Sequence, residues 1–193
     1  MRMIDLYLAG YAGRKATELR RAALLLDALV VDVRLSPRSP RPEWRKYPLI
    51  GLIKGRYLWV QDWGNVNYAN GGPVQIRDFE RGLEALRGAG DWRRLILLCG
   101  CARTEQCHRL VLADELAWNH LPCVVYELDW ADPASSVRIS TYDALRRPGS
   151  TLMESMTPAR PDEKSFDDLP HVSFADAARS RRRSLLGETN AAE

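Results

Sequence analysis

Hydrophobic positions along the first 128 residues follow two patterns. Short apolar runs, several of them rich in valine, isoleucine and leucine, predict buried strands at residues 3–10, 29–33, 56–60, 95–99 and 122–128. Apolar residues three and four positions apart predict amphipathic helices at residues 16–28, 76–90 and 104–120. This alternation predicts an α/β fold. It would be a mostly parallel sheet of about five strands with helices on both faces, in a Rossmann-like three-layer arrangement.

The pattern fades after residue 145. Prolines are scattered there among serines and charged residues, at Pro148, Pro158, Pro161 and Pro170. Segments of this composition bury too little apolar surface to order a chain. We therefore expect a single α/β domain over 1–145, followed by a partly disordered tail rich in proline, serine and charge over 146–193.

The composition is that of an ordinary globular protein, with 46% hydrophobic and 27% charged residues. No apolar stretch approaches the roughly 20 residues of a membrane helix, and no signal-peptide pattern follows Met1. We therefore expect a cytoplasmic protein without a membrane partner. The chain has 4 cysteines, and this number does not suggest a disulfide framework, so reduced thiols or metal ligands are favoured.

Positive charge is concentrated in one predicted loop. The net charge of the chain is +3, and the segment 34–48, RLSPRSPRPEWRKYP, holds five basic residues and one acidic residue. Such a patch attracts phosphate groups. A solvated loop in a chain that uses arginine freely is an equally open interpretation.

The loops that follow the first four predicted strands carry most of the chemically useful side chains. In an open parallel sheet, ligands bind beyond the carboxyl ends of the strands, so we expect these loops to converge on one site. In chain order the candidates are Arg14 and Lys15, then Asp32, Arg34 and Arg38, then Trp63, Asn65, Asn67 and Tyr68, then Cys99, Cys107, His108 and Arg109.

The first two loops offer anion-binding groups. The glycines of GYAGRK, 10–15, permit a tight turn that leaves backbone N–H groups free for an anion, although a simple strand-to-helix turn explains them as well. Asp32 and Arg34 lie on the same side of their strand because side chains alternate. They are either a buried ion pair, or an anion-binding arginine held by Asp32, or a site where Asp32 transfers protons.

The third loop combines aromatic rings and amides. Trp63 and Tyr68 are suited to stacking on a base, and Asn65 and Asn67 are suited to reading its edge. Turn-forming asparagines beside core aromatic residues are an alternative that stays open.

Three cysteines lie within nine residues of the stretch LILLCGCARTEQCHR, 95–109. With Thr104 as the predicted N-cap of the following helix, Cys107 falls near the third helical position, where the helix dipole favours a thiolate. His108 and Arg109 would lower its pKa further. The sequence therefore predicts Cys107 or Cys99 as a nucleophile, with His108 or Asp32 transferring protons.

Two other interpretations of the cysteines stay open. Zinc accepts Cys99, Cys101, Cys107 and His108 as ligand types. Adjacent Cys107 and His108 on a helix would, however, point about 100 degrees apart, which argues against joint ligation. Alternatively, Cys99 belongs to the core, Cys101 has no particular role, and Cys107, His108 and Arg109 form a polar cluster that caps the helix. We therefore expect a site without a metal or other cofactor, with zinc as an alternative.

Four motifs occur together in this order: GYAGR, VVDVRLSPRS, WGNVNY and LLC…CHR…LAD. Over residues 4–128 the chain thereby resembles the bacterial and archaeal domain of unknown function 488 family. The resemblance implies an α/β domain with a site built from these motifs, and it implies no substrate. In that family the loop between the two cysteines commonly begins Ala-Glu. Here it is GCARTEQ, so Cys101 looks peculiar to this chain.

These observations predict an enzyme that acts on a phosphate-bearing substrate by hydrolysis or group transfer, and they favour a nucleotide or nucleic acid as that substrate. The residues expected to hold the anion are Arg14, Lys15, Arg34, Arg38 and Arg109. The residues expected to face a base or sugar are Trp63, Asn65, Asn67 and Tyr68. The alternatives are a non-catalytic nucleic-acid-binding module, with further phosphate contacts from RSRRR at 179–183, and a zinc-stabilised interaction domain.

Overall fold

The computed structural model describes residues 3–141 and contains one six-stranded sheet. The strand order is β3-β2-β4-β1-β5-β6, in which the first five strands are parallel and β6 is antiparallel to β5. The strands are β1 (Ile4–Gly10), β2 (Leu29–Asp32), β3 (Tyr57–Trp59), β4 (Arg94–Cys99), β5 (Cys123–Glu127) and β6 (Val137–Arg138). The predicted parallel sheet is confirmed, and only the two-residue strand β6 was not expected. The predicted tail 146–193 lies outside the described residues.

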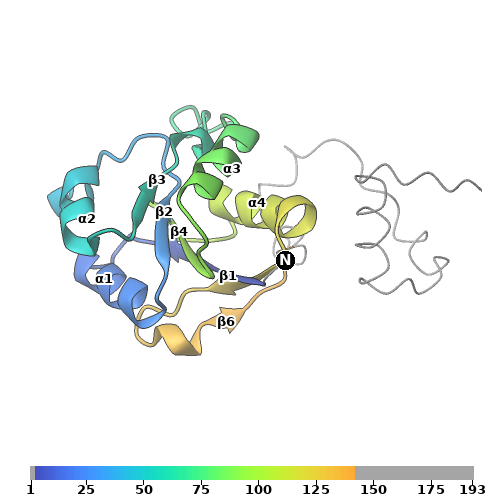
Figure 1. Cartoon of the computed structure of the whole chain (residues 1–193). Coiled ribbons are helices and arrows are strands. Elements are labelled where there is room, and N and C mark those ends of the chain that lie inside the picture. The colour runs from blue at the N-terminus through green and yellow to red at the C-terminus, as the bar shows by residue number, and fades with distance from the viewer. Residues whose placement is uncertain (1–2, 142–193) are drawn as a thin grey trace, which may run out of the picture. The chain divides into compact units, whose positions relative to one another are not determined.

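Helices cover both faces of the sheet, as predicted. Helices α1 and α2 pack on one face, and α3 and α4 pack on the other (Figure 1). The α-helices are α1 (Ala16–Leu25), α2 (Lys46–Ile53), α3 (Phe79–Gly88) and α4 (His108–Glu115). Shorter turns are the 3-10 helices Pro42–Trp44, Gln61–Trp63 and Pro133–Ser135, and the π-helix Leu116–His120. Within residues 3–141, no helix has the length and apolar character that would let it cross a membrane.

Helix α2 was not predicted, because the whole connection between the predicted strands 29–33 and 56–60 was assigned to a loop. Pro48 falls within its first turn. A proline is tolerated there, since the first backbone N–H groups of a helix have no intrahelical partner. Leu49 and Ile53 of α2 are buried against the sheet.

The apolar strands bury side chains on both faces because successive residues point in opposite directions. In β4, Leu97 and Cys99 belong to the core beneath α3 and α4, whereas Ile96 and Leu98 belong to the core beneath α1 and α2. The alternation therefore directs the sulfur of Cys99 toward the face that α4 covers.

The predicted start of the third helix is wrong. Helix α4 begins at His108, and Cys107 is its N-cap with φ −120° and ψ 136°, an extended conformation. Thr104 does not cap the helix; its side chain donates a hydrogen bond to Glu127 at 2.7 Å. The predicted placement of Cys107 near the third helical position is therefore also wrong.

The connections around β1 and β4 place a crevice at their carboxyl ends. These strands are neighbours, with Gly10 opposite Cys99. The chain leaves β1 over one face through α1 to reach β2, and leaves β4 over the other face through α4 to reach β5. In parallel sheets, ligands bind where neighbouring connections diverge in this way.

Candidate functional site

A cavity of about 300 Å³ lies at the carboxyl ends of β1, β2 and β4. The predicted site residues that line it are Arg34, Arg38, Asn65, Tyr68, Cys99 and His108. Its other lining residues are Tyr11, Leu35, Ser36 and Gly100. The structure therefore brings together groups from each of the four predicted loops, although from the first loop only Tyr11 reaches the cavity. We call this cavity the thiol pocket.

Cys99 and His108 lie side by side among the residues that line the thiol pocket. The Cys99 sulfur lies 3.8 Å from His108 Nδ1, and His108 Nε2 lies 2.8 Å from the carbonyl oxygen of Val33. A carbonyl oxygen only accepts, so Nε2 carries the hydrogen and, in the neutral ring, the lone pair of Nδ1 faces the sulfurs of Cys99 and Cys107, each at 3.8 Å. His108 is therefore oriented as a base for the Cys99 thiol.

The pKa directions of the two groups agree with this orientation. The contacts of Cys99 with Cys101 and then Cys107, together with the neighbouring His108, hold the pKa of the Cys99 thiol well below its usual value. Burial lowers the pKa of His108, but the Cys99 sulfur and the hydrogen bond to Val33 outweigh it, and the pKa of His108 is raised. Both directions favour transfer of the thiol proton to Nδ1.

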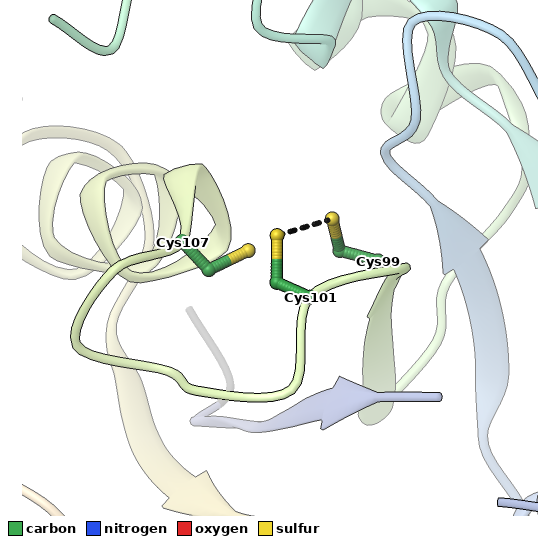
Figure 2. Close-up of side chains that lie close together, drawn as sticks. All are labelled: Cys99, Cys101 and Cys107. Carbon is green, nitrogen blue, oxygen red and sulfur yellow. Dashed lines mark hydrogen bonds between the residues drawn. The ribbon is translucent and has the colours of Figure 1, made fainter. Parts of the chain in front are cut away.

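Three cysteine sulfurs lie together beside the thiol pocket, and they point toward one another from the end of β4, the following loop and the start of α4 (Figure 2). The sulfurs of Cys99 and Cys101 are 3.6 Å apart, and all three, including that of Cys107, lie within 4.8 Å of one another. All are free thiols. We call Cys99, Cys101 and Cys107 the sulfur cluster.

Within the sulfur cluster, the pKa favours Cys99 as the thiolate. Burial raises the pKa of the Cys107 thiol to about 12, and the contacts of Cys101 with Cys107 and Cys99 raise the pKa of Cys101. Cys107 is buried and is not among the residues that line the thiol pocket. The role predicted for Cys107 rested on a helical position that it does not occupy, and of these two buried thiols only Cys99 lines the thiol pocket.

Arg109 does not line the thiol pocket, contrary to its predicted role in substrate binding. Its side chain is fully buried. The guanidinium donates to the carbonyl oxygen of Cys101 at 3.3 Å, to the sulfur of Cys107 at 3.4 Å and to the hydroxyl of Thr104 at 2.9 Å. Arg109 therefore braces the loop between β4 and α4 and places a positive charge against the sulfur cluster.

Strand β1 ends at Gly10, and the loop between β4 and α4 passes directly over this glycine. A Cβ atom on Gly10 would lie 2.1 Å from the carbonyl oxygen of Cys101 and 2.7 Å from a terminal nitrogen of Arg109. Only glycine allows so close an approach. The glycine that the sequence suggested for anion binding instead makes room for the cysteine loop.

Asp32 and Arg34 form a buried ion pair. Arg34 Nε donates to Asp32 Oδ1 at 2.7 Å, a terminal nitrogen contacts Oδ2, and the Tyr57 hydroxyl donates to Oδ2 at 2.6 Å. Asp32 is fully buried and is not among the residues of the thiol pocket, so its predicted part in proton transfer has no geometric support. The expected buried ion pair is therefore present, and since Arg34 also lines the thiol pocket, the pair agrees equally with the interpretation as an anion-binding arginine held by Asp32.

Arg34 also lines the thiol pocket, but most of its donors are already used. Its second terminal nitrogen donates to the carbonyl oxygen of Trp44 at 2.8 Å and to the Tyr11 hydroxyl at 3.3 Å. Burial lowers the pKa of Arg34, but the contacts with Asp32 outweigh it and the pKa is raised, so the side chain stays charged. Of the five N–H groups of Arg34, one on the terminal nitrogen that contacts Asp32 is left to donate to a ligand.

The third loop is held mainly by its own contacts. Trp63 is fully buried, and its indole N–H donates to the carbonyl oxygen of Phe79 at 3.0 Å, so its ring does not reach the thiol pocket. Asn65 Oδ1 accepts the backbone N–H of Asn67 at 3.1 Å. The interpretation as turn-forming asparagines beside a core aromatic residue therefore fits Trp63, Asn65 and Asn67. Tyr68, which is 73% exposed, lines the thiol pocket.

Arg14 and Lys15 lie outside the thiol pocket. The guanidinium of Arg14 lies 5.7 Å from the centre of the Trp130 ring, and the backbone N–H of Lys15 donates to the Glu18 carboxylate at 2.7 Å. Gly13 has φ +74°, which a turn of this kind requires. The segment is thus a strand-to-helix turn, and the anion-binding role predicted for Arg14 and Lys15 has no geometric support.

A second and wider groove of about 780 Å³ adjoins the thiol pocket, with which it shares Leu35, Ser36 and Arg38. Its remaining lining residues are Pro37, Ser39, Pro40, Arg45, Lys46, Tyr47, Trp59 and Gln61. The ammonium group of Lys46 lies 4.2 Å from the centre of the Trp59 ring, and Tyr47 is 81% exposed. We call it the basic groove. The charge of segment 34–48 indicated this surface, but the pairing of its cations with Tyr47 and Trp59 depends on the unpredicted helix α2.

Comparison of the chain with family models, with curated proteins and with solved structures finds no match. The resemblance to the domain of unknown function 488 family therefore stays a prediction.

Proposed function

We propose that the protein is an enzyme that acts on a phosphate-bearing substrate, a nucleotide or nucleic acid, with Cys99 as the nucleophile. One observation carries this proposal. The Cys99 sulfur and His108 Nδ1, 3.8 Å apart, line the same cavity as Arg34 and Arg38. A nucleophile beside an oriented base, with two arginines lining the same cavity, is an arrangement suited to group transfer from an anionic substrate.

The dyad supports a two-step displacement. His108 Nδ1 takes the proton of the Cys99 thiol, and the sulfur attacks phosphorus, forming an S–P bond as the P–O bond to the leaving group breaks. His108 returns the proton to the leaving oxygen. A water molecule then gives a proton to His108 and attacks phosphorus, which breaks the S–P bond and regenerates Cys99. With an acceptor hydroxyl in place of water, the same steps transfer the phosphoryl group.

Arg38 is the cation best placed to hold the substrate. Its side chain is exposed, it lines both the thiol pocket and the basic groove, and it makes no ion pair within residues 3–141. The charge of Arg34, by contrast, is already balanced by Asp32. Arg34 therefore serves to shape the pocket and to donate one hydrogen bond, while Arg38 supplies the attraction for phosphate.

The sizes of the two cavities favour a nucleotide or a short nucleic-acid segment. A cavity of about 300 Å³ is at the small end of the range for ligand sites and suits one phosphate with its sugar. The basic groove continues from it with cations at Arg45 and Lys46 and exposed ring surface at Tyr47. Cations that track phosphates beside rings that stack bases are typical of single-strand binding surfaces.

The basic groove also supports a second candidate, a nucleic-acid-binding module without catalysis. Its cations and rings do not depend on any thiol. Binding alone would show the steep loss of affinity with added salt that phosphate contacts cause. Removal of the Cys99 sulfur distinguishes the two functions. A binding module would keep its full affinity for nucleic acid without this sulfur, whereas the enzyme would lose its turnover.

The experiment is a turnover assay with the full chain. Phosphomonoesters, phosphodiesters, nucleotides and single-stranded oligonucleotides are offered in turn to the wild type and to the Cys99→Ser variant. We expect kcat/KM on the best substrate to fall by about 10⁴-fold or more in Cys99→Ser, as for loss of a covalent nucleophile. Cys123→Ser is the matched control and should retain turnover. Turnover that survives Cys99→Ser would contradict the proposal.

A further inference from the structure

We propose that the sulfur cluster, together with His108, is a binding site for one thiophilic divalent cation, namely zinc. The ligands are the sulfurs of Cys99, Cys101 and Cys107 and the Nδ1 atom of His108. All four atoms come from one short stretch of chain. Figure 2 shows the three cysteines at the end of β4, in the following loop and at the start of α4, and His108 is the first residue of α4.

Three of the distances between these atoms match the edges of a tetrahedral zinc site. With Zn–S near 2.3 Å and Zn–N near 2.0 Å, a tetrahedron has edges of about 3.8 Å between sulfurs and about 3.6 Å between sulfur and nitrogen. The sulfurs of Cys99 and Cys101 are 3.6 Å apart, and His108 Nδ1 is 3.8 Å from the sulfur of Cys99 and 3.8 Å from that of Cys107. The widest separation between sulfurs is within 4.8 Å. The three sulfurs therefore need to move by no more than about 1 Å to close around the ion, and His108 Nδ1 already lies beside two of them.

The conformation of Cys107 removes the objection raised by its neighbour His108. Two adjacent residues inside a helix point about 100 degrees apart. Cys107 is not inside the helix, because it is the extended N-cap and His108 is the first helical residue. The bend of the chain between them turns both side chains the same way, so that the Cys107 sulfur and His108 Nδ1 lie 3.8 Å apart.

The surroundings of the four ligands are those that a metal site needs. A metal-binding histidine usually donates its second ring N–H to a carbonyl or carboxylate, and His108 Nε2 lies 2.8 Å from the carbonyl oxygen of Val33. Three thiolates carry three negative charges, which Zn²⁺ and the buried Arg109, 3.4 Å from the sulfur of Cys107, balance completely. Cys99 and His108 line the thiol pocket, so the ion has a path from solvent.

A four-ligand site of this kind leaves no open position on the metal. The ion would hold both the sulfur of Cys99 and the lone pair of His108, which are the groups that the proposed reaction uses. Bound zinc therefore prevents Cys99 and His108 from reacting, and removal of the zinc restores their reactivity. The metal site stands on its own geometry, whereas this regulatory consequence rests on the proposed function.

The test measures cobalt and zinc binding by the full chain. Co²⁺ added to reduced, chelator-treated protein should give the visible bands of tetrahedral cobalt and the near-ultraviolet absorption of thiolate ligation, both abolished by one equivalent of Zn²⁺. Cys101→Ser removes a ligand that the proposed reaction does not use. We expect it to weaken zinc binding by more than about 100-fold, since even outer partners of a metal ligand are worth about 10- to 100-fold.

Cys123→Ser is the matched control and should bind zinc as the wild type does. Thermal unfolding in the presence of chelator, which should be the same for both variants, excludes a folding defect. Absence of the thiolate absorption, or equal zinc affinity in the two serine variants, would overturn the metal site and leave the proposed function standing. If the protein binds zinc but Cys99 does not react with an alkylating agent in the presence of chelator, the metal site stands and the proposed function is overturned. Zinc that binds without slowing the alkylation of Cys99 would overturn the regulatory role.

Discussion

Arg34 contacts both carboxylate oxygens of Asp32, and one side of the same guanidinium lines the thiol pocket. Arg34→Leu would leave Asp32 buried without its partner. Breaking a buried pair from one side costs about 3–5 kcal/mol, so we expect urea unfolding to show a loss of this size in the free energy of unfolding. The double variant Asp32→Asn with Arg34→Leu buries no charge and should recover part of it. Unchanged stability in Arg34→Leu would contradict the structural role of the pair.

Arg38 is the contrasting arginine, since it is exposed and lines both cavities without an ion pair in the described part of the chain. We expect Arg38→Ala to weaken the binding of a nucleoside monophosphate by about 10-fold, because a charge-assisted hydrogen bond contributes about 1.5 kcal/mol. Isothermal titration calorimetry measures this. Arg20→Ala, which removes an exposed cation from α1, should have no effect, and equal losses in the two variants would point to general charge attraction.

Gly10 lets the cysteine loop pass over the end of β1. We expect Gly10→Ala to destabilise the protein by about 1–3 kcal/mol, the usual cost of overpacking, because its Cβ would lie 2.1 Å from the carbonyl oxygen of Cys101. Gly51→Ala is the matched control. It lies in α2 with no atom within 4 Å of the added Cβ, so it should stabilise the helix by about 0.5–1 kcal/mol. Thermal unfolding of both variants checks the opposite signs.

Cys123 is the reference thiol for any labelling experiment. Burial in β5 raises its pKa to about 11. A raised thiol pKa means that the neutral form persists to higher pH, so the thiolate that reacts with iodoacetamide is scarce until the pH approaches about 11. We expect the labelling rate of Cys123, followed by mass spectrometry, to rise steadily from pH 7 to pH 10. A rate that levels off below pH 9 would show that burial does not control this thiol.

The sheet and its layers follow from the sequence, but the start of helix α4 does not. Apolar runs such as 95–99 predict buried strands because their period and length leave few alternatives. Thr104 has the side chain of a helix cap, yet it contacts Arg109 and Glu127, and Glu127 is distant in sequence and lies in β5. Local patterns cannot reveal a competing partner of this kind, which is why the N-cap of α4 lies three residues later than predicted, at Cys107 in place of Thr104.

The candidate site is predictable in its loops and less so in its side chains. Strand order brings the loops after β1, β2, β3 and β4 to one edge, as the alternation of elements indicated. Whether a side chain then faces the cavity depends on packing across the sheet. Trp63 turns into the core because Gly82 leaves space for its ring, and Arg109 turns inward beneath the cysteine loop. The sequence next to Trp63 and Arg109 does not predict that either side chain points into the core.

The central claim is that Cys99 is the reactive thiol of the chain, oriented toward His108 at the wall of the thiol pocket. The most direct measurement is the rate of iodoacetamide labelling at each of the 4 cysteines, resolved by mass spectrometry on the reduced, chelator-treated full chain at neutral pH. We predict that Cys99 is labelled first, that His108→Ala slows this labelling, and that Cys123 keeps its rate in that variant. Equal and slow labelling of all the cysteines would contradict the account.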